Sequence, residues 1–164
     1  MEARSPFPVP QSPLSTSSRM PSSRYSVHPS LARMGGSTAD AAAYLRDAPR
    51  YVEAMYAKRP ALRPLHDALE ALAFSLGDDI RLCPGQTIVP VYRRHVIAQI
   101  KPATKTRIDF GLALGGLKGK GRLQETGGFA KKDRITHRIA VTSLDDIDQE
   151  LRDWLRRAYA GDAG

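Results

Sequence analysis

The spacing of hydrophobic residues changes near residue 77. Before that point hydrophobic residues recur at the spacing of an α-helix. The pattern predicts a short helix over 41–48, which stops before Pro49, and a second over 50–58. A third helix is predicted after Pro64, and its hydrophobic stripe consists of Leu65, Ala68, Leu69, Leu72 and Leu76.

After Gly77 hydrophobic and polar residues alternate, which is typical of β-strands. The clearest example is 107–114, where Ile108, Phe110, Leu112 and Leu114 point to one face. Pro90 has no backbone N–H to donate, so it indicates that its strand lies at a sheet edge. The alternation predicts five strands, over 80–82, 87–92, 95–100, 107–114 and 135–141.

A closing helix is predicted after residue 143. Ser143 is the expected N-cap, and Asp146 stands three residues later, as in a capping box. The hydrophobic stripe of this helix consists of Ile147, Leu151, Trp154, Leu155 and Ala158. Helices, then strands, then a helix predict an α+β fold: a mostly antiparallel sheet of about five strands, with helices before it and one closing C-terminal helix.

The chain of 164 residues has room for one domain. Residues 1–36 contain nine serines and six of the 12 prolines but few large hydrophobic residues, so we predict a disordered leader. Residues 37–164 are the predicted α+β domain. An alternative start of translation at Met34 would leave residues 1–33 untranslated.

Cysteine and histidine usage argues against disulfide and metal chemistry. Cys83 is the single cysteine, so no intramolecular disulfide can form. The histidines, which are His28, His66, His95 and His137, show no metal-ligand spacing, and neither a metal nor a cofactor is predicted. No run of 18 hydrophobic residues and no signal-peptide core is present, which predicts a cytoplasmic protein without a membrane partner.

Positive charge is concentrated in the strand region. The whole chain carries a net charge of +8, while residues 84–143 hold twelve basic and three acidic residues, a net of +9. Such a surface attracts polyanions such as nucleic acid. The residues expected to bind an anion are Arg93, Arg94, Lys101, Lys105, Arg107, Lys118, Lys120, Arg122 and Arg138. In the alternative interpretation, these cations only keep exposed strands from pairing with other chains.

Motifs that suggest chemistry each lack an essential residue. The Gly-rich segment 111–123 has the spacing of a phosphate-binding loop, but Arg122-Leu123 stands where Lys and Ser or Thr are required. Gln99 and Lys101 follow Asp79 in an order similar to a restriction-type nuclease, yet Gln99 supplies no charge to a metal ion. We therefore predict no catalytic residue.

Two further patterns bear on function. His137 falls on the hydrophobic face of its strand, so we expect a buried, hydrogen-bonded histidine and not a metal ligand. Tyr92, Phe110 and Phe129 are the aromatic residues of the basic region, and no RNP motif is present. Base stacking on a sheet platform is therefore not indicated.

Four segments together resemble a bacterial family catalogued as domain of unknown function 5655. They are IVPVYRRHVIAQI (88–100), TRIDFGLAL (106–114), RLQETGGFA (122–130) and THRIAVTSLDDIDQELRDWLRRAYA (136–160). The resemblance covers about residues 45–160. It implies an α+β fold, and it implies no assigned activity and no catalytic residues.

The sequence therefore favours a small binding module without chemistry, which engages a polyanion through its basic strands and Gly-rich loop. One alternative is a domain that binds or acts on a small anion in a pocket formed by His95, Arg107, Asp109 and Arg138. A degenerate restriction-type nuclease belongs to this second class. A third alternative is a protein-interaction module in which the charge only confers solubility.

Overall fold

The computed structural model describes residues 25–26 and 38–162. Two helices come first: α3 (Thr38–Tyr56) and α4 (Arg63–Phe74), with the short 3-10 helix η2 (Pro60–Leu62) between them. The strands are β1 (Arg81–Leu82), β2 (Val89–Tyr92), β3 (Val96–Pro102), β4 (Ile108–Leu112), β5 (Gln124–Glu125) and β6 (His137–Val141). The 3-10 helix η3 (Leu144–Asp146) and helix α5 (Gln149–Gly161) close the domain.

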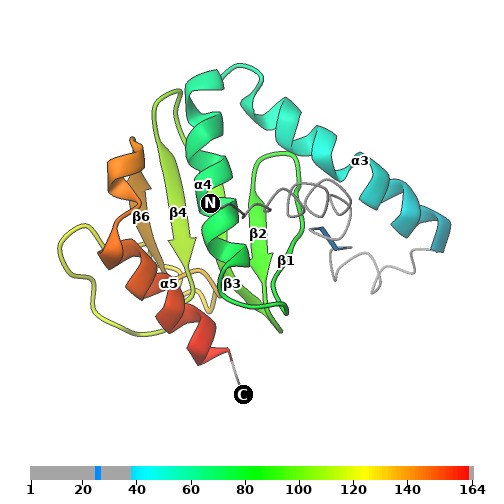
Figure 1. The fold of residues 1–164 in the computed structure, drawn as a ribbon. Coiled ribbons are helices and arrows are strands. Elements are labelled where there is room, and N and C mark those ends of the chain that lie inside the picture. Colours follow the sequence, from blue (N-terminus) through cyan, green and yellow to red (C-terminus); the bar gives the residue numbers. More distant parts are fainter. Residues whose placement is uncertain (1–24, 27–37, 163–164) are drawn as a thin grey trace, which may run out of the picture.

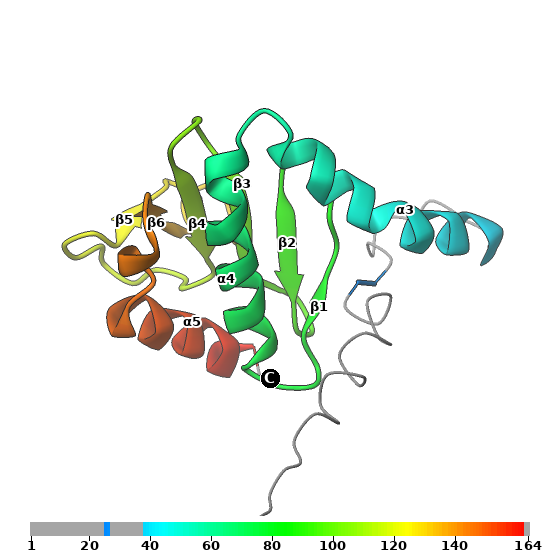
Figure 2. The ribbon, with the colours of Figure 1, turned by 45° about the horizontal axis from the view of Figure 1, so that its top comes forward.

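The six strands form one antiparallel sheet in the order β1-β2-β3-β4-β6-β5. Helices α4 and α5 lie on one face of this sheet, and α3 extends past its β1 edge (Figures 1 and 2). The predicted α+β class is confirmed, with one strand more than expected. The missed strand, β5, is two residues long and both residues are exposed, so it carries no alternation that a sequence pattern could reveal.

Strand alternation builds the core as predicted. Ile100, Phe110 and Ile139 are paired in one row across β3, β4 and β6, and all three are fully buried. Leu151 and Leu155 of α5 are buried in the same hydrophobic core. The regular spacing of these residues leaves the opposite face of the sheet to polar side chains.

Two predictions about the helices are corrected. The two short helices expected on either side of Pro49 are one helix, α3, with Pro49 inside it. Proline removes one backbone hydrogen bond, but buried Val52, Met55 and Tyr56 beyond it hold the helix against the core. Ser143 and Asp146 do form a capping box, but on η3, and α5 begins later under its own cap, Asp148.

Pro90 does not mark an edge strand, because β2 lies between β1 and β3. The carbonyl of Pro90 accepts a 3.1 Å hydrogen bond from the amide of Cys83. The ring nitrogen of Pro90 therefore faces the side of β1, just past Leu82, where that two-residue strand has ended. The residue opposite it on that side is Cys83, which follows β1, so the proline lacks a donor only where the ladder has already ended.

The predicted leader lies outside the described residues except for Tyr25 and Ser26. Tyr25 forms a bridge with Leu82, and the amide of Ser26 donates a 2.9 Å hydrogen bond to the carbonyl of Leu82. These two residues therefore lie against the β1 edge of the sheet.

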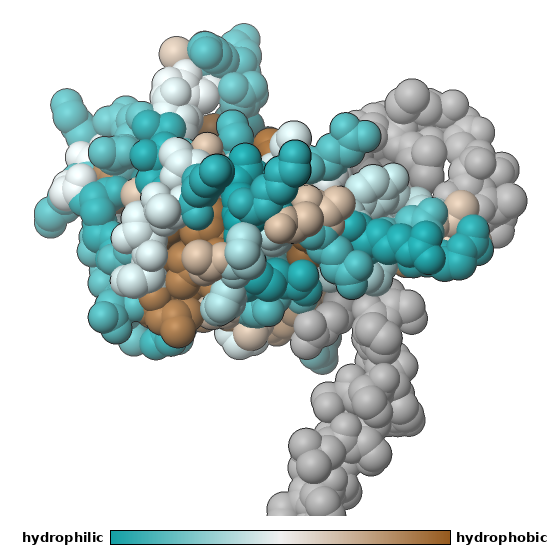
Figure 3. Space-filling view, turned by 90° about the horizontal axis from the view of Figure 1, so that it is seen from above, coloured by the Kyte–Doolittle hydropathy of each residue, from teal (hydrophilic) through white to brown (hydrophobic). Residues whose placement is uncertain are grey.

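Hydrophilic residues cover most of the described surface seen from above, and hydrophobic residues gather in a smaller area in the lower part of that view (Figure 3). Within the described ranges, no helix combines the length and the hydrophobicity needed to cross a bilayer.

Candidate anion-binding site

The face of the sheet opposite α4 and α5 carries a row of polar and small residues. Gln99, Gly111 and Arg138 are paired across β3, β4 and β6, and Lys101 is paired with Asp109 in the next outward-facing row. These positions alternate along each strand with the buried positions. The strand register that pairs the buried residues therefore also pairs these outward-facing residues. This outer face is the floor of the candidate site.

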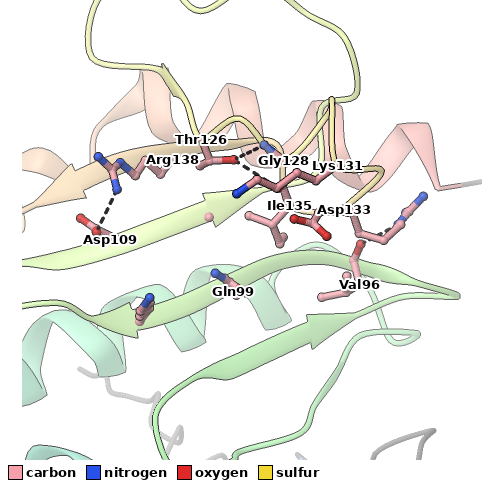
Figure 4. Close-up of a pocket in the computed structure, with 12 residues that line it drawn as sticks. Val96, Gln99, Asp109, Thr126, Gly128, Lys131, Asp133, Ile135 and Arg138 are labelled. Atoms are coloured by element: carbon pink, nitrogen blue, oxygen red, sulfur yellow. Dashed lines mark hydrogen bonds and ion pairs between the residues drawn. The ribbon is translucent and has the colours of Figure 1, made fainter.

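A pocket of about 430 Å³ opens on this face. Its floor comes from the strands, and one wall comes from the loop between β5 and β6 (Figure 4). Its lining comprises Val96, Gln99, Lys101, Asp109, Gly111, Thr126, Gly128, Lys131, Asp133, Arg134, Ile135 and Arg138. Four of these residues are basic and two are acidic, so the pocket has an excess of positive charge.

The β5–β6 loop is folded by its own backbone. The carbonyl of Gly128 accepts hydrogen bonds from the amides of Lys131 (3.0 Å) and Asp133 (2.8 Å), which closes a tight turn. A side chain at Gly128 would collide with the carbonyl oxygen of Ile135, so glycine is required there. The turn holds Lys131 on the wall of the pocket, beside Ile135 (Figure 4).

Asp109, on the pocket floor, pairs with two arginines, of which Arg138 lines the pocket and Arg107 adjoins it. Its carboxylate is 3.0 Å from Nε of Arg107 and 3.7 Å from Nη1 of Arg138, and its side chain is only 14% exposed. The two arginine side chains remain 41% and 47% exposed. A largely buried carboxylate between two more exposed cations fixes their positions without neutralising both, which leaves positive charge facing solvent.

At the other end of the pocket, Arg134 is paired with Asp162, the residue just past α5. Its Nε donates to the carbonyl of Val96 at 3.3 Å, and its Nη2 lies 3.4 Å from Oδ1 of Asp162. The side chain of Arg134 is still 51% exposed. Lys101 lies at the opposite end of β3, so cations occupy both ends of the pocket.

The nine predicted anion-binding residues do not form one cluster. Lys101 and Arg138 line the pocket, and Arg107 adjoins it through Asp109. Lys118 and Lys120 are exposed on the loop after β4, and neither lines this pocket. Lys105 lines a neighbouring pocket.

Two of the nine predicted residues are held in structural contacts. Nε of Arg93 lies 2.8 Å from Asp79, its Nη1 donates to the carbonyl of Tyr159, and its guanidinium stacks on the Tyr159 ring at 3.9 Å. Arg122 is 2.7 Å from Asp148 and donates to the carbonyl of Asp146, which joins the Gly-rich loop to the start of α5. The backbone amide of Arg94 donates to Asp162.

Of the four residues in the alternative pocket, Arg107 and Arg138 both pair with Asp109. His95 does not line the pocket; its Nδ1 donates a 2.7 Å hydrogen bond to Asp162. This separation arises because His95 belongs to the turn before β3, where the end of α5 is docked. The sequence could not place residue 162 beside residue 95.

The residues of the nuclease-like pattern are also separated. Gln99 and Lys101 line the pocket, whereas Asp79 accepts hydrogen bonds from Arg93 (2.8 Å) and Tyr159 (2.7 Å). The hydrogen bond from Arg93, followed by that from Tyr159, lowers the pKa of Asp79 below its usual range. Among the described residues no group of three His, Cys, Asp or Glu side chains is arranged to hold a metal ion.

His137 is buried and hydrogen-bonded, as predicted. One ring nitrogen lies 2.8 Å from the hydroxyl of Thr136 and the other 2.7 Å from the carbonyl of Leu117. Since a carbonyl only accepts, Nε2 carries the proton and Nδ1 accepts from Thr136. The residue therefore anchors the Gly-rich loop to β6.

Sequence reasoning did not select the residues of the loop wall, above all Lys131 and Arg134. A signal was present, because the pair Gly127-Gly128 marks a turn just before the run Lys131-Lys132-Asp133-Arg134. The spacing alone, however, did not show that this run folds back over the sheet.

The fold and the pocket define the class: a small α+β domain with helices on one sheet face and a basic pocket on the other. A family model described as Domain of unknown function (DUF5655) matches residues 52–160, which is more than half of the chain, and the chain belongs to this family. The resemblance inferred from the strand segments is thereby confirmed. No curated protein and no solved structure matches the chain.

Proposed function

We propose that this domain is a binding module for a polyanion, which it engages without chemistry at the pocket on the outer sheet face. The observation that carries the proposal is the convergence of Lys101, Lys131, Arg134 and Arg138 on one pocket. These residues come from two strands and a loop. Separate parts of the chain thus supply one concentration of positive charge, which attracts phosphate groups.

The pocket chemistry supports binding over catalysis. Among its described lining residues there is neither cysteine nor histidine, and Thr126 supplies the only hydroxyl group. The Thr126 hydroxyl lies 3.3 Å from the carbonyl of Ile135 and accepts from the amide of Gly128 at 3.1 Å. Asp109 is occupied by Arg107 and Arg138. We further propose a cytoplasmic setting, where the single cysteine, Cys83, needs no disulfide partner.

The proposal is tested with inorganic polyphosphate as the polyanion and pyrophosphate as the small anion. We expect the double variant Lys131→Gln/Arg138→Gln to bind polyphosphate about tenfold more weakly at low salt. The slope of log K against log salt should fall by about 2, one for each lost contact. Lys118→Gln/Lys120→Gln is the matched control, because it removes the same charge from exposed positions outside the pocket.

Three outcomes separate the alternatives. Equal loss of affinity in both double variants would mean that total charge alone determines binding. This result would refute the pocket as the binding site. Pyrophosphate binding as tight as polyphosphate binding, with little dependence on salt, would favour the small-anion alternative. Undetectable binding of either anion at low ionic strength would favour a protein-interaction module.

A further inference from the structure

The basic pocket continues into a second pocket at the Lys101 end of β3. This second pocket has a volume of about 530 Å³, and Lys101 lines both. Its exposed apolar surface comes from Ala54 and Ala57. Its other basic residues are Lys58, Arg59 and Lys105, and no acidic residue is among its described lining. A ligand held by Lys101 can therefore extend into this second pocket without meeting negative charge.

A third pocket adjoins the opposite end of the site. Its volume is about 490 Å³, and it shares Asp133 and Arg134 with the basic pocket. Ala113 and Thr136 contribute to it, at the ends of β4 and β6. The pocket is also lined by the aromatic ring of Phe129 and the positively charged side chain of Lys132.

The three pockets follow one line along β3. The amide of Ala113, in the third pocket, donates to the carbonyl of Ile97 at the start of β3. Pro102, in the second pocket, is the last residue of β3. The stretch from Val96 to Lys101 between them spans about 17 Å at about 3.3 Å per residue. Shared cations therefore connect three depressions into one extended basic track.

Phe129 is unusual for its exposure. It is 63% exposed, although it is a large hydrophobic residue on a loop with few others. The tip of its ring sits over Gly116, where an added Cβ would lie 3.0 Å from Cζ. The absence of a side chain at residue 116 therefore lets the ring rest there. An exposed aromatic ring beside a basic track is the combination that proteins use to bind unpaired bases by stacking.

We propose that the ligand of this track is single-stranded nucleic acid, with its phosphates along Lys132, Arg134, Lys101 and Lys105 and one base stacked on Phe129. This inference rests on the proposed polyanion function and specifies its ligand. A base in a duplex is stacked between its neighbours and cannot offer its face to Phe129, so the unpaired strand is favoured. The bases of such a strand would also meet the exposed apolar residues of the second pocket, Ala54 and Ala57.

The test compares four probes of about eight residues each: oligothymidylate, oligouridylate, an abasic deoxyribose-phosphate oligomer and a DNA duplex. The full chain is expected to bind oligothymidylate more tightly than the abasic oligomer or the duplex. Phe129→Ala should weaken oligothymidylate binding about tenfold and leave abasic binding unchanged, because stacking requires a base. Phe129→Trp should retain the preference for bases. The oligouridylate arm shows whether DNA or RNA is the better ligand.

Leu144→Ala is the matched control for Phe129→Ala, because Leu144 is the other large hydrophobic residue that is mostly exposed, at 57%, in the described part of the chain. Lys58→Gln/Lys105→Gln tests the second pocket and should weaken oligothymidylate binding, with the salt slope reduced by about 1.4, because each phosphate contact with a single strand contributes about 0.7.

Equal affinity for the abasic oligomer and oligothymidylate, together with an unchanged Phe129→Ala variant, would overturn the inference. Duplex binding as tight as single-strand binding would do the same. The polyphosphate experiment fails or succeeds independently, since it needs no base and no contribution from Phe129.

Discussion

Asp162 accepts a 2.7 Å hydrogen bond from the imidazole Nδ1 of His95, across 67 positions of the sequence. The same carboxylate accepts hydrogen bonds of 2.8 Å from the backbone amides of Arg94 and His95. The Asp162 side chain is only 4% exposed. A carboxylate just past α5 thus fixes the turn that precedes β3, and with it one end of the basic pocket, since Arg134 also reaches Asp162.

Asp162→Asn is expected to destabilise the domain at pH 7. The asparagine side chain has one acceptor oxygen, and its NH2 group would face N–H donors that now bind the second carboxylate oxygen. The free energy of unfolding should therefore fall by about 1–3 kcal/mol. Urea unfolding of the variant and of the native chain measures the difference. Glu53→Gln changes an exposed carboxylate on α3 and should unfold like the native chain.

The stabilisation by Asp162 should disappear in acid. Burial opposes ionisation of Asp162, but the hydrogen bonds from His95 and Arg94 outweigh it and lower the pKa below its usual range. The ionised carboxylate therefore stabilises the fold fully above the unfolded-state pKa of about 3.9, and this contribution is lost as the pH falls through the lower folded-state pKa. Unfolding experiments between pH 7 and pH 2.5 should show the native chain and Asp162→Asn converging. A constant difference across that range would contradict this assignment.

Arg122 should contribute to stability and not to anion binding. Its Nη1 lies 2.7 Å from Asp148, the N-cap of α5, and its Nη2 lies 2.6 Å from the carbonyl of Asp146. Arg122→Gln should lower the free energy of unfolding by about 1 kcal/mol, a modest value because the pair is partly solvated. Polyphosphate titration should detect at most a small change in affinity. Arg138→Gln should show the opposite pattern, and similar binding losses in both variants would contradict this division.

Gly111→Ala should destabilise the domain and distort the pocket floor. An added Cβ would lie 2.8 Å from both Cγ of Gln99 and Cγ2 of Ile135, which pack over Gly111 from β3 and the loop wall. Overpacking of this kind costs about 1–3 kcal/mol, measurable by urea unfolding. Gly161→Ala is the matched control, because nothing lies within 4 Å of its added Cβ, and it should be neutral or slightly stabilising.

Tyr56→Phe should leave a buried acceptor unsatisfied. The Tyr56 hydroxyl donates to Nδ1 of His66 at 2.9 Å, because Nε2 of that ring donates to Glu70, and both Tyr56 and His66 are buried. Loss of the hydroxyl should reduce the free energy of unfolding by about 1–3 kcal/mol in thermal or urea unfolding. Tyr51→Phe on the same helix provides the comparison, because Tyr51 is only half-buried and its contact is with the Tyr44 ring. Equal losses would show that the hydroxyl of Tyr56 is not the cause.

Much of the candidate site follows from strand alternation. Because Ile108, Phe110 and Leu112 must be buried, Asp109 and Gly111 must face outward, and the same reasoning places Arg138 beside them once β4 and β6 are paired. The pairing itself could not be read from the chain. It depends on a register between segments about 30 residues apart, which a two-residue period leaves open.

The sequence pattern determined the α+β class and the buried residues of each strand. It also located the positive charge between residues 84 and 143. Both results follow because side-chain periodicity and charge are properties of the sequence. Tertiary structure decided which cations converge. Arg93 forms an ion pair with Asp79, and Arg122 forms one with Asp148. The β5–β6 loop, in contrast, places Lys131 and Arg134 in the lining of the basic pocket. The reason is physical: an ion pair or a pocket depends on distances in space, and these are set by strand register and helix docking together.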